Sequence, residues 1–256
     1  LNADILSLLE IENRPAAAED FISRLSAATE QPWQLVRCAK STGSSSSIMV
    51  AIAYRSDRVK QVTEAQCDSA EIHSRLPLLA GFRAVNGKAQ ASKPFAVVAI
   101  HFKSKSGCPQ SGDIDRGQGC WNRLRSEQAA ALNSFIGEWR ATNSGIPVLI
   151  AGDLNAYGNE DPVQVLAETG KVDLLAEHIA WPQRYTYIFR GESGYLDHLQ
   201  ATRNLARRLS DVYVLPVNAD EPYVLEYNTG GPQGRYRDES PFRSADHDPI
   251  AVDLYN

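Results

Sequence analysis

Acidic, imidazole and amide side chains recur at the ends of predicted strands, where a fold can gather them into one pocket. These residues are Glu10 and Glu12, His101, Asp153 and Asn155, Asp197 and His198, and Asp246 and His247. In an extended segment, residues i and i+2 point to the same side, so Asp153 and Asn155 face one pocket. Carboxylates hold hard divalent cations, and an imidazole beside a carboxylate binds anions or moves protons. Together these residue types suit metal-assisted hydrolysis.

Each of these segments also has an ordinary structural interpretation. Asp153 and Asn155 follow an apolar run and Gly, and Asp and Asn there often form a turn by bonding their own backbone. A lone histidine at a strand end, such as His101, is more often structural, and His247 between two acids could lie in an exposed loop. The joint occurrence of all five segments, in this order along the chain, favours the chemical interpretation.

The apolar pattern predicts short strands interspersed with a few helices. The predicted strands cover residues 5–9, 33–38, 48–54, 58–62, 78–85, 95–102, 147–151, 195–201, 211–216 and 250–255. Helices are predicted from Pro15 to about Thr29 and from about Asn122 to Thr142. The second helix carries an apolar stripe of Leu124, Ala131, Leu132, Phe135, Ile136 and Trp139, with Arg123, Arg125, Glu127 and Glu138 off it. Residues 218–245 are predicted to form an irregular loop. The pattern indicates an α/β (α+β) fold, with two packed sheets and helices outside.

Length and composition favour one large unit. The chain has 256 residues with 43% hydrophobic content, which predicts a single domain over 1–256. No apolar run approaches the length of a membrane span, so we expect no membrane insertion, and a monomer is the default expectation. The net charge of -5 argues against nucleic-acid binding through a broad basic surface. A carboxylate cluster that holds a cation makes an enzyme acidic by itself, and the metal reverses the local field.

The four cysteines, Cys38, Cys67, Cys108 and Cys120, predict two disulfides. Four cysteines allow three pairings, of which we favour the local one, Cys38–Cys67 and Cys108–Cys120. The second bridge would close a Gly-rich polar loop. A zinc site is disfavoured, because no CxxC pair occurs and no histidine stands at ligand spacing from these cysteines. Disulfides indicate an oxidising compartment, so we expect a secreted or periplasmic protein.

Six phrases along nearly the whole chain resemble the endonuclease/exonuclease/phosphatase superfamily, the deoxyribonuclease I-like enzymes. They are LLEIEN at 8–13, AYRSDRV at 53–59, AIHFKSK at 99–105, IAGDLNAYGNEDP at 150–162, YLDHLQAT at 195–202 and SPFRSADHDPIAV at 240–252. GDLNAYGNEDP and FRSADHDP are the most specific, and the sequence looks closest to the bacterial extracellular nuclease branch. The resemblance implies a four-layer sandwich of two packed mixed β-sheets flanked by helices. It also implies Mg²⁺ as cofactor, with Mn²⁺ as a substitute and Ca²⁺ as a further candidate ion.

The resemblance assigns roles to the polar strand ends. Glu10 matches the metal-binding glutamate, and Asp246 an acid near the metal. Asp153 matches the acid that activates the attacking water, and Asn155 the amide that helps to hold the phosphate.

The remaining matches are imidazoles and their partner. His247 matches the imidazole that contacts the scissile phosphate, Asp197 the acid that orients it, and His101 the second active-site histidine of the nuclease branch. Four basic residues near these phrases could contact flanking phosphates, with a solvated basic face as the equally common alternative. They are Lys103, Lys105, Arg123 and Arg125.

The family's fold normally begins with a strand that carries an Asn at the metal or phosphate site. This sequence starts at Leu1 and has Met49 as its only methionine, so we expect that strand to lie outside the stated sequence. The function implied is that of a secreted Mg²⁺-dependent deoxyribonuclease, an endonuclease, with DNA favoured over RNA as substrate. Two alternatives stay open: a phosphatase or sphingomyelinase-like phosphodiesterase of the same superfamily, and a non-catalytic binding domain.

Overall fold

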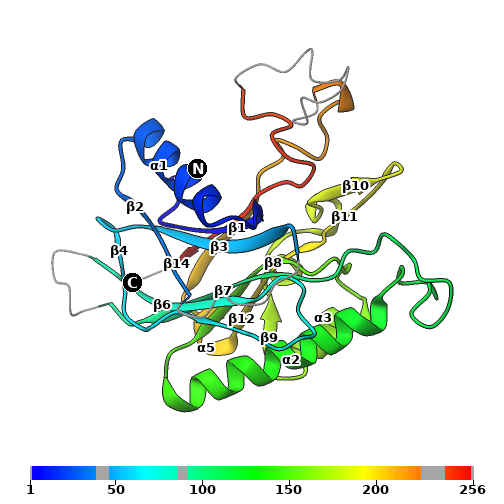
Figure 1. Ribbon diagram of the computed structural model, residues 1–256, viewed down its shortest axis with the longest axis horizontal. Coiled ribbons are helices and arrows are strands. Elements are labelled where there is room, and N and C mark those ends of the chain that lie inside the picture. Colours follow the sequence, from blue (N-terminus) through cyan, green and yellow to red (C-terminus); the bar gives the residue numbers. More distant parts are fainter. Residues whose placement is uncertain (1, 39–45, 86–91, 226–239, 255–256) are drawn as a thin grey trace.

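The computed structural model describes residues 2–38, 46–85, 92–225 and 240–254. Its largest element is a seven-stranded mixed sheet in the order β4-β6-β7-β8-β12-β9, with β5 paired to β6 (Figure 1). The strands are β4 (Val59–Gln61), β5 (Gln66–Cys67), β6 (Leu78–Ala84), β7 (Phe95–His101), β8 (Val148–Asp153), β9 (Lys171–Asp173) and β12 (Asp197–Thr202). The central strands β7 and β8 are parallel and almost entirely buried, as their continuous apolar runs require.

A second β-layer covers one face of this sheet in two pieces. The first piece is a three-stranded sheet in the order β1 (Ile5–Glu12), β3 (Ile48–Arg55) and β2 (Trp33–Leu35). The second is the pair β13 (Leu209–Val214) and β14 (Ile250–Leu254). No described strand joins β1 to β14. The predicted architecture of two packed sheets is confirmed.

Alternation of side chains along β7 and β8 shows that both pieces lie on the same face. Val97 and Ala99 pack with the core of β3, whereas Leu149 and Ala151 pack with the core of β13 and β14. These four residues share one face, because Val97 pairs with Leu149 and residues two apart in a strand point the same way.

Helices form the two outer layers. On the far face of the seven-stranded sheet, α2 (Asn122–Thr142) and α3 (Asp161–Ala167) cover β7 and β8. On the outer face of β1 and β3 lies α1 (Pro15–Thr29), which buries Ile22 against Trp33 and Ala53. Figure 1 shows the resulting order of helix, small sheet, large sheet and helix. The four layers predicted from the resemblance are therefore present.

Long periodic segments were predictable, whereas most of the short ones were not. The structure confirms both predicted helices and all ten predicted strands, with ends shifted by up to three residues. Residue 255 of the last predicted strand, and residues 226–239 of the predicted loop, lie outside the described residues. The elements without a prediction are α3, β5, β9, α4 (Leu174–His178), β10 (Tyr187–Phe189), β11 (Glu192–Gly194), α5 (Arg203–Ala206) and the 3-10 turns Trp181–Gln183 and Tyr223–Leu225. Each has at most seven residues, too few for a period to emerge.

Both predicted disulfides are confirmed. Cys38–Cys67 joins the segment after β2 to β5, and Cys108–Cys120 closes the loop that leads into α2. Among the described residues, no helix combines the length and apolarity that crossing a bilayer requires.

Candidate active site

The registers of three neighbouring strands place His101, Asp153 and Asp197 in one row. His101 at the end of β7 lies opposite Asp153 on β8, and Asp153 lies opposite Asp197 on β12. Directly paired residues project from the same face, so the three side chains stand side by side over the second β-layer. All three are buried. The structure thus brings together residues that are almost a hundred positions apart in the sequence.

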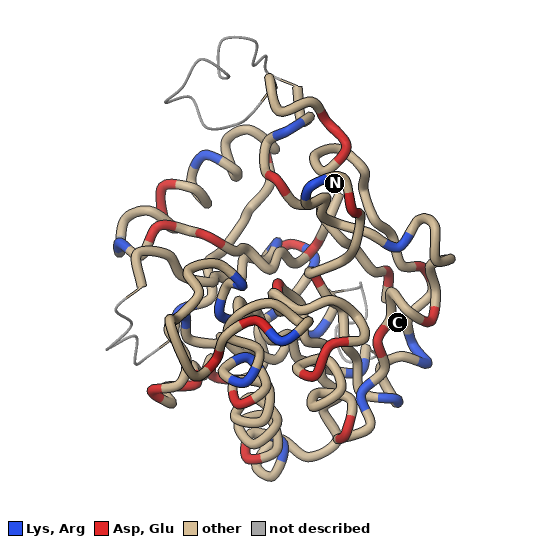
Figure 2. The backbone as a smooth tube through the Cα atoms, turned by 90° about the vertical axis from the view of Figure 1, so that its right-hand side faces the viewer, with Lys and Arg blue, Asp and Glu red and all other residues tan. Residues whose placement is uncertain are grey.

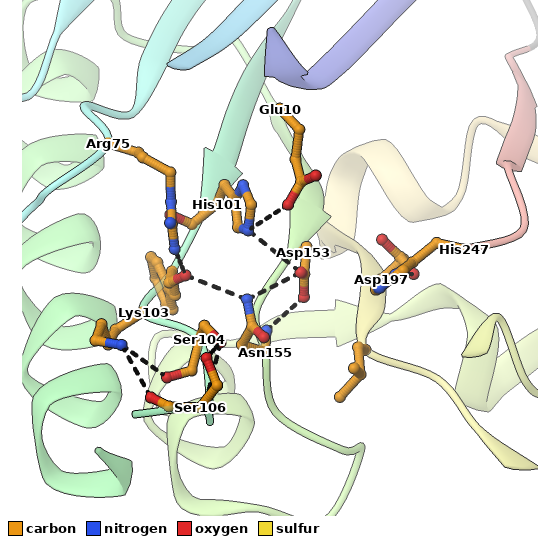
Figure 3. Close-up of polar contacts among 12 residues, drawn as sticks. Glu10, Arg75, His101, Lys103, Ser104, Ser106, Asp153, Asn155, Asp197 and His247 are labelled. Atoms are coloured by element: carbon orange, nitrogen blue, oxygen red, sulfur yellow. Dashed lines mark hydrogen bonds and ion pairs between the residues drawn. The ribbon is translucent and has the colours of Figure 1, made fainter. Parts of the chain in front are cut away.

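Glu10 reaches this row from the opposing layer because of a β-bulge. The pairing of β1 with β3 shifts between Leu8 and Ile11, and Glu10 there has a φ of 57°. Left-handed backbone is uncommon for a residue other than glycine, and bulges often re-aim a side chain at a functional site. The Glu10 carboxylate is 62% exposed and lies 4.0 Å from Nε2 of His101 (Figure 3).

The turn after β8 fixes the Asp153 carboxylate. Gly152 permits the close pairing of β8 with β7, since a Cβ at this position would lie 2.0 Å from the carbonyl oxygen of Ile100. Asn155 then donates its backbone N–H to Oδ1 of Asp153 at 2.5 Å and its side-chain amide to Oδ2 at 2.9 Å. The same amide donates to the carbonyl of Phe102 at 3.2 Å. Asn155 therefore forms the turn of the structural interpretation and also orients the carboxylate.

His247 is held against the row by Asp197. Its Nδ1 lies 2.7 Å from Oδ2 of Asp197, and the hydroxyl of Thr186 donates to the same oxygen at 2.6 Å. Burial by itself disfavours the charged imidazole, but the charge and hydrogen bond of Asp197 outweigh it. With further help from the charges of Asp153 and Asp246, the pKa of His247 rises to about 10. The His247 side chain is therefore a charged imidazolium next to the row at neutral pH.

A buried aspartate anchors the loop that carries His247. Oδ1 of Asp248 accepts the backbone N–H groups of Val217, Asn218 and Ala219 at 3.0, 2.7 and 3.0 Å. The side-chain amide of Asn218 donates to the carbonyl of His247 at 2.7 Å. The sequence analysis assigned no role to Asp248 or Asn218. The second acid of the DHDP phrase was the available signal for Asp248, and nothing in the sequence marks Asn218.

Within the row, the pKa values of His101 and Asp153 are shifted in opposite directions. Burial, followed by the charges of Arg75 and His247, lowers the pKa of His101 to about 3, so this imidazole is neutral at physiological pH. Burial and the charge of Asp197 raise the pKa of Asp153 to about 7. Nε2 of His101 lies 3.4 Å from Oδ2 of Asp153. A carboxylate with a pKa near the working pH is suited to accept a proton from water.

Arg75 is a site residue that the sequence analysis missed. Its guanidinium donates to the carbonyl of His101 at 3.0 Å and to that of Phe102. It thereby places a positive charge next to His101 and braces the end of β7 (Figure 3). No phrase of the sequence marks Arg75, which lies in an irregular segment before a predicted strand.

The four basic residues that were predicted to contact phosphates lie in different surroundings. The prediction for Arg125 is wrong: the residue is fully buried and donates to the carbonyls of Cys120, Gln118 and Lys103 at 2.7, 3.0 and 3.3 Å. It lies on the buried stripe of α2, not off it, because it is seven positions before Leu132.

The other three basic residues differ in their surroundings. Lys105 is half-enclosed and paired with Glu160 at 2.5 Å, so its charge is already matched inside the protein. Lys103 lies beside the site and donates to the carbonyls of Ser104 and Ser106 (Figure 3). Its ammonium group also lies 5.2 Å from the centroid of the Trp121 ring. Arg123 is 76% exposed. Among the described residues, Figure 2 shows basic and acidic positions interspersed along the backbone.

The site fits a divalent cation that keeps much of its water. The described residues contain no group of three or more His, Cys, Asp or Glu side chains arranged to hold a metal. Mg²⁺ is commonly held by one or two carboxylates plus waters and substrate oxygens. Glu10 offers such a carboxylate at the open side of the row, with hard oxygen donors of Asp153 nearby.

The sequence profile of the endonuclease/exonuclease/phosphatase family matches residues 1–247. The chain belongs to this family. Its members are hydrolases that act on phosphoester bonds, and they generally use divalent metals. A search of curated protein sequences returned no match.

Three solved structures of this fold illustrate the range of relatives. TDP2 from Caenorhabditis elegans, in truncated form, has a TM-score of 0.59 and 16% identity, and the match covers 100% of this chain and 85% of that one. A mannosyl-6-phosphatase from Bacteroides thetaiotaomicron has a TM-score of 0.59 and 14% identity, with 99% and 85% covered. The catalytic domain of human nocturnin has a TM-score of 0.53 and 16% identity, with 82% and 71% covered. At these identities the likeness establishes the fold only.

Proposed function

We propose that this protein is a secreted, Mg²⁺-dependent deoxyribonuclease that hydrolyses phosphodiester bonds within nucleic acid. The observation that carries the proposal is the row of His101, Asp153 and Asp197, with a protonated His247 bonded to Asp197. This arrangement places a candidate base, Asp153, and a cation, His247, next to the same carboxylate, Asp197, and attack of water on a phosphate uses both a base and a cation.

Each residue takes a role that its surroundings favour. Asp153, held by Asn155, accepts the proton of the attacking water, a contribution on the order of 10²–10⁴ in rate. His247 stabilises the negative charge that develops on the phosphate oxygens, because Asp197 keeps it protonated. Neutral His101 can donate or accept a hydrogen bond without adding charge.

Glu10 and Asp246 are the residues that we assign to the metal. Mg²⁺, with Mn²⁺ as a substitute, would polarise the phosphate and offset its charge when bound. A Ca²⁺ site elsewhere remains a separate prediction. The two disulfides support an oxidising, extracytoplasmic location, and we infer that the protein is secreted or periplasmic.

The charges of the site are compatible with a phosphodiester substrate. Asp153 and Asp197 are buried beside each other, and Glu10 adds a third carboxylate. A bound divalent cation and the His247 imidazolium would offset these charges where the phosphate docks. A phosphatase is the second candidate, because a mannosyl-6-phosphatase shares the fold. We further propose that the chain forms one domain over 1–256, acts as a monomer and prefers DNA to RNA.

The test is a substrate panel at equal protein concentration, in Mg²⁺ and in EDTA. It contains single-stranded and duplex DNA, RNA, mannose 6-phosphate and sphingomyelin vesicles. We expect hydrolysis of DNA in Mg²⁺, loss of it in EDTA, and loss of it in His247→Ala. Turnover of only the sugar phosphate, or only sphingomyelin, by folded protein would refute the nuclease proposal.

A further inference from the structure

A short hairpin beside His247 carries exposed aromatic side chains. β10 and β11 pair from Tyr187 with Gly194 to Phe189 with Glu192, leaving a two-residue turn. Both turn residues, Arg190 and Gly191, have positive φ values, 53° and 85°. That conformation is the hairpin turn whose twist matches its strands. Figure 1 shows the hairpin projecting from the body of the protein.

The rings form a row that begins at the catalytic imidazole. The ring of Tyr187 lies 4.6 Å from that of His247, and the ring of Phe189 lies 6.4 Å from that of Tyr187 at an angle of 15°. Residues 187 and 189 share one face of β10 because they are two positions apart. The guanidinium of Arg190 lies 5.2 Å from the ring of Phe189 and ends the row. We call these four residues the aromatic row.

The base of the hairpin is fixed to the active site. Thr186, which precedes Tyr187, donates through its hydroxyl to Asp197 and accepts the backbone N–H of Asp248 at its carbonyl. Its own N–H donates to the carbonyl of Gly194 on the other strand. The hairpin and the loop of His247 are therefore held together, so the position of the aromatic row relative to the reacting phosphate is set by the fold.

Core packing does not account for Phe189, at the outer end of the aromatic row. Phe189 is 51% exposed and belongs to none of the buried clusters of the described residues. A single exposed ring is ordinary at a protein surface. The alignment of Phe189 with Tyr187 and His247 is what points to a ligand. A flat π-surface with a neighbouring guanidinium suits another flat ring, such as a nucleobase.

We propose that the aromatic row stacks unpaired nucleobases next to the scissile phosphate, so that the preferred substrate is single-stranded nucleic acid. The proposal rests on the proposed nuclease function and specifies its substrate. Bases in a duplex are already stacked on their neighbours and expose only their edges, whereas an unpaired base can turn its face to Tyr187 or Phe189. Stacking of this kind tolerates any sequence, because every base has a π-face.

The composition of the hairpin tip favours a nucleic acid over a lipid surface. Phe189 is followed by Arg190, Gly191 and Glu192, so one exposed ring stands among charged and small residues. Interfacial insertion depends on the apolar area that enters the bilayer, and a single ring next to a carboxylate offers little.

The test measures binding in EDTA, which prevents cleavage. The probe is a fluorescent ten-residue oligothymidylate, and its anisotropy is followed for wild type, Phe189→Ala, Phe189→Trp and Phe21→Ala. Phe21 is the matched control, an exposed phenylalanine on α1. We expect Phe189→Ala to weaken binding about tenfold, with Phe189→Trp and Phe21→Ala close to wild type. A strand of the same length with abasic residues should bind equally to wild type and Phe189→Ala.

Two further measurements separate the possible failures. In Mg²⁺, the ratio of kcat/KM for single-stranded to duplex DNA should fall in Phe189→Ala and stay unchanged in Phe21→Ala. Equal ratios in wild type and Phe189→Ala would overturn the stacking platform while leaving the nuclease intact. Failure of wild type to cleave any nucleic acid would instead refute the nuclease function. Binding to sphingomyelin vesicles that depends on Phe189 would replace nucleobases by lipid as the ligand of the row.

Discussion

Nδ1 of His247 lies 2.7 Å from Oδ2 of Asp197, and this contact joins the last loop of the chain to the central sheet. It fixes the orientation of the imidazole and keeps it charged, because a carboxylate at this distance favours the protonated form. The pKa of about 10 that follows makes His247 a cation across the physiological range. In the proposed mechanism, this contact lets His247 stabilise a phosphate that gains negative charge.

Asp197→Asn should remove most activity without unfolding the protein. The amide keeps the shape of the carboxylate but supplies no charge, so the pKa of His247 should fall from about 10 toward its ordinary value of 6.5. We expect kcat at pH 8 to drop about 100-fold or more. The pH at which activity is lost on the alkaline side should move down as well, which a purely structural role would not produce. Thr186→Val removes the second hydrogen bond to Asp197 together with the long one that the Leu196 N–H donates to the Thr186 hydroxyl at 3.4 Å; it is the control and should show a smaller loss.

The wild-type pH profile of kcat/KM should be bell-shaped. Asp153 must be deprotonated to act as base, so activity rises with pH through about 7, the pKa to which burial and Asp197 raise it. His247 must be protonated, so activity falls as pH passes about 10. A bound divalent cation favours the carboxylate and shifts the acid limb toward lower pH. An activity maximum near pH 4 would contradict these assignments.

Glu10→Gln should raise the Mg²⁺ concentration needed for half-maximal activity about tenfold or more, since it removes a carboxylate from the metal. Glu12→Gln offers a matched control two residues along the same strand. Glu12 pairs with Arg14 at the surface, whereas Glu10 lies 4.0 Å from His101. The measurement is a titration of rate against Mg²⁺ for both variants. Equal curves for Glu10→Gln and wild type would remove Glu10 from the metal site.

Arg125→Met should destabilise the protein by about 3 kcal/mol, because the carbonyls of Cys120 and Lys103 lose the guanidinium as donor in a buried setting, while that of Gln118 keeps Lys105. Arg123→Met, at an exposed position two residues earlier, should stay within about 0.5 kcal/mol of wild type. Urea unfolding of the two variants gives the comparison. Normal stability of Arg125→Met with a weakened affinity for DNA would restore the phosphate contact that the structure rejects.

The limits of the sequence-based prediction are visible at particular residues. Glu10, His101, Asp153, Asp197 and His247 were predictable because each follows or ends an apolar run within a recognisable phrase. Their alignment could not be predicted, since it depends on the registers that pair His101 with Asp153 and Asp153 with Asp197. Strand pairing between distant segments leaves no local signal.

Residues that act through contacts with the backbone could not be predicted from the sequence either. Arg75 and Asn218 bond to main-chain carbonyls, and their partners become known only once the fold is known. Arg125 was misplaced for a related reason. Its charge predicted exposure, but buried carbonyls compensate that charge, and its helical position on the apolar stripe decides its place.

The most direct test of the nuclease function is cleavage of a circular single-stranded DNA by wild type and His247→Ala, in Mg²⁺ and in EDTA. A circle has no ends, so any linear product reports an internal phosphodiester cut. We predict linear product with wild type in Mg²⁺ alone, and a loss of at least about 100-fold in His247→Ala. An intact circle with folded wild-type protein in Mg²⁺, or equal cleavage by His247→Ala, would contradict the proposed function.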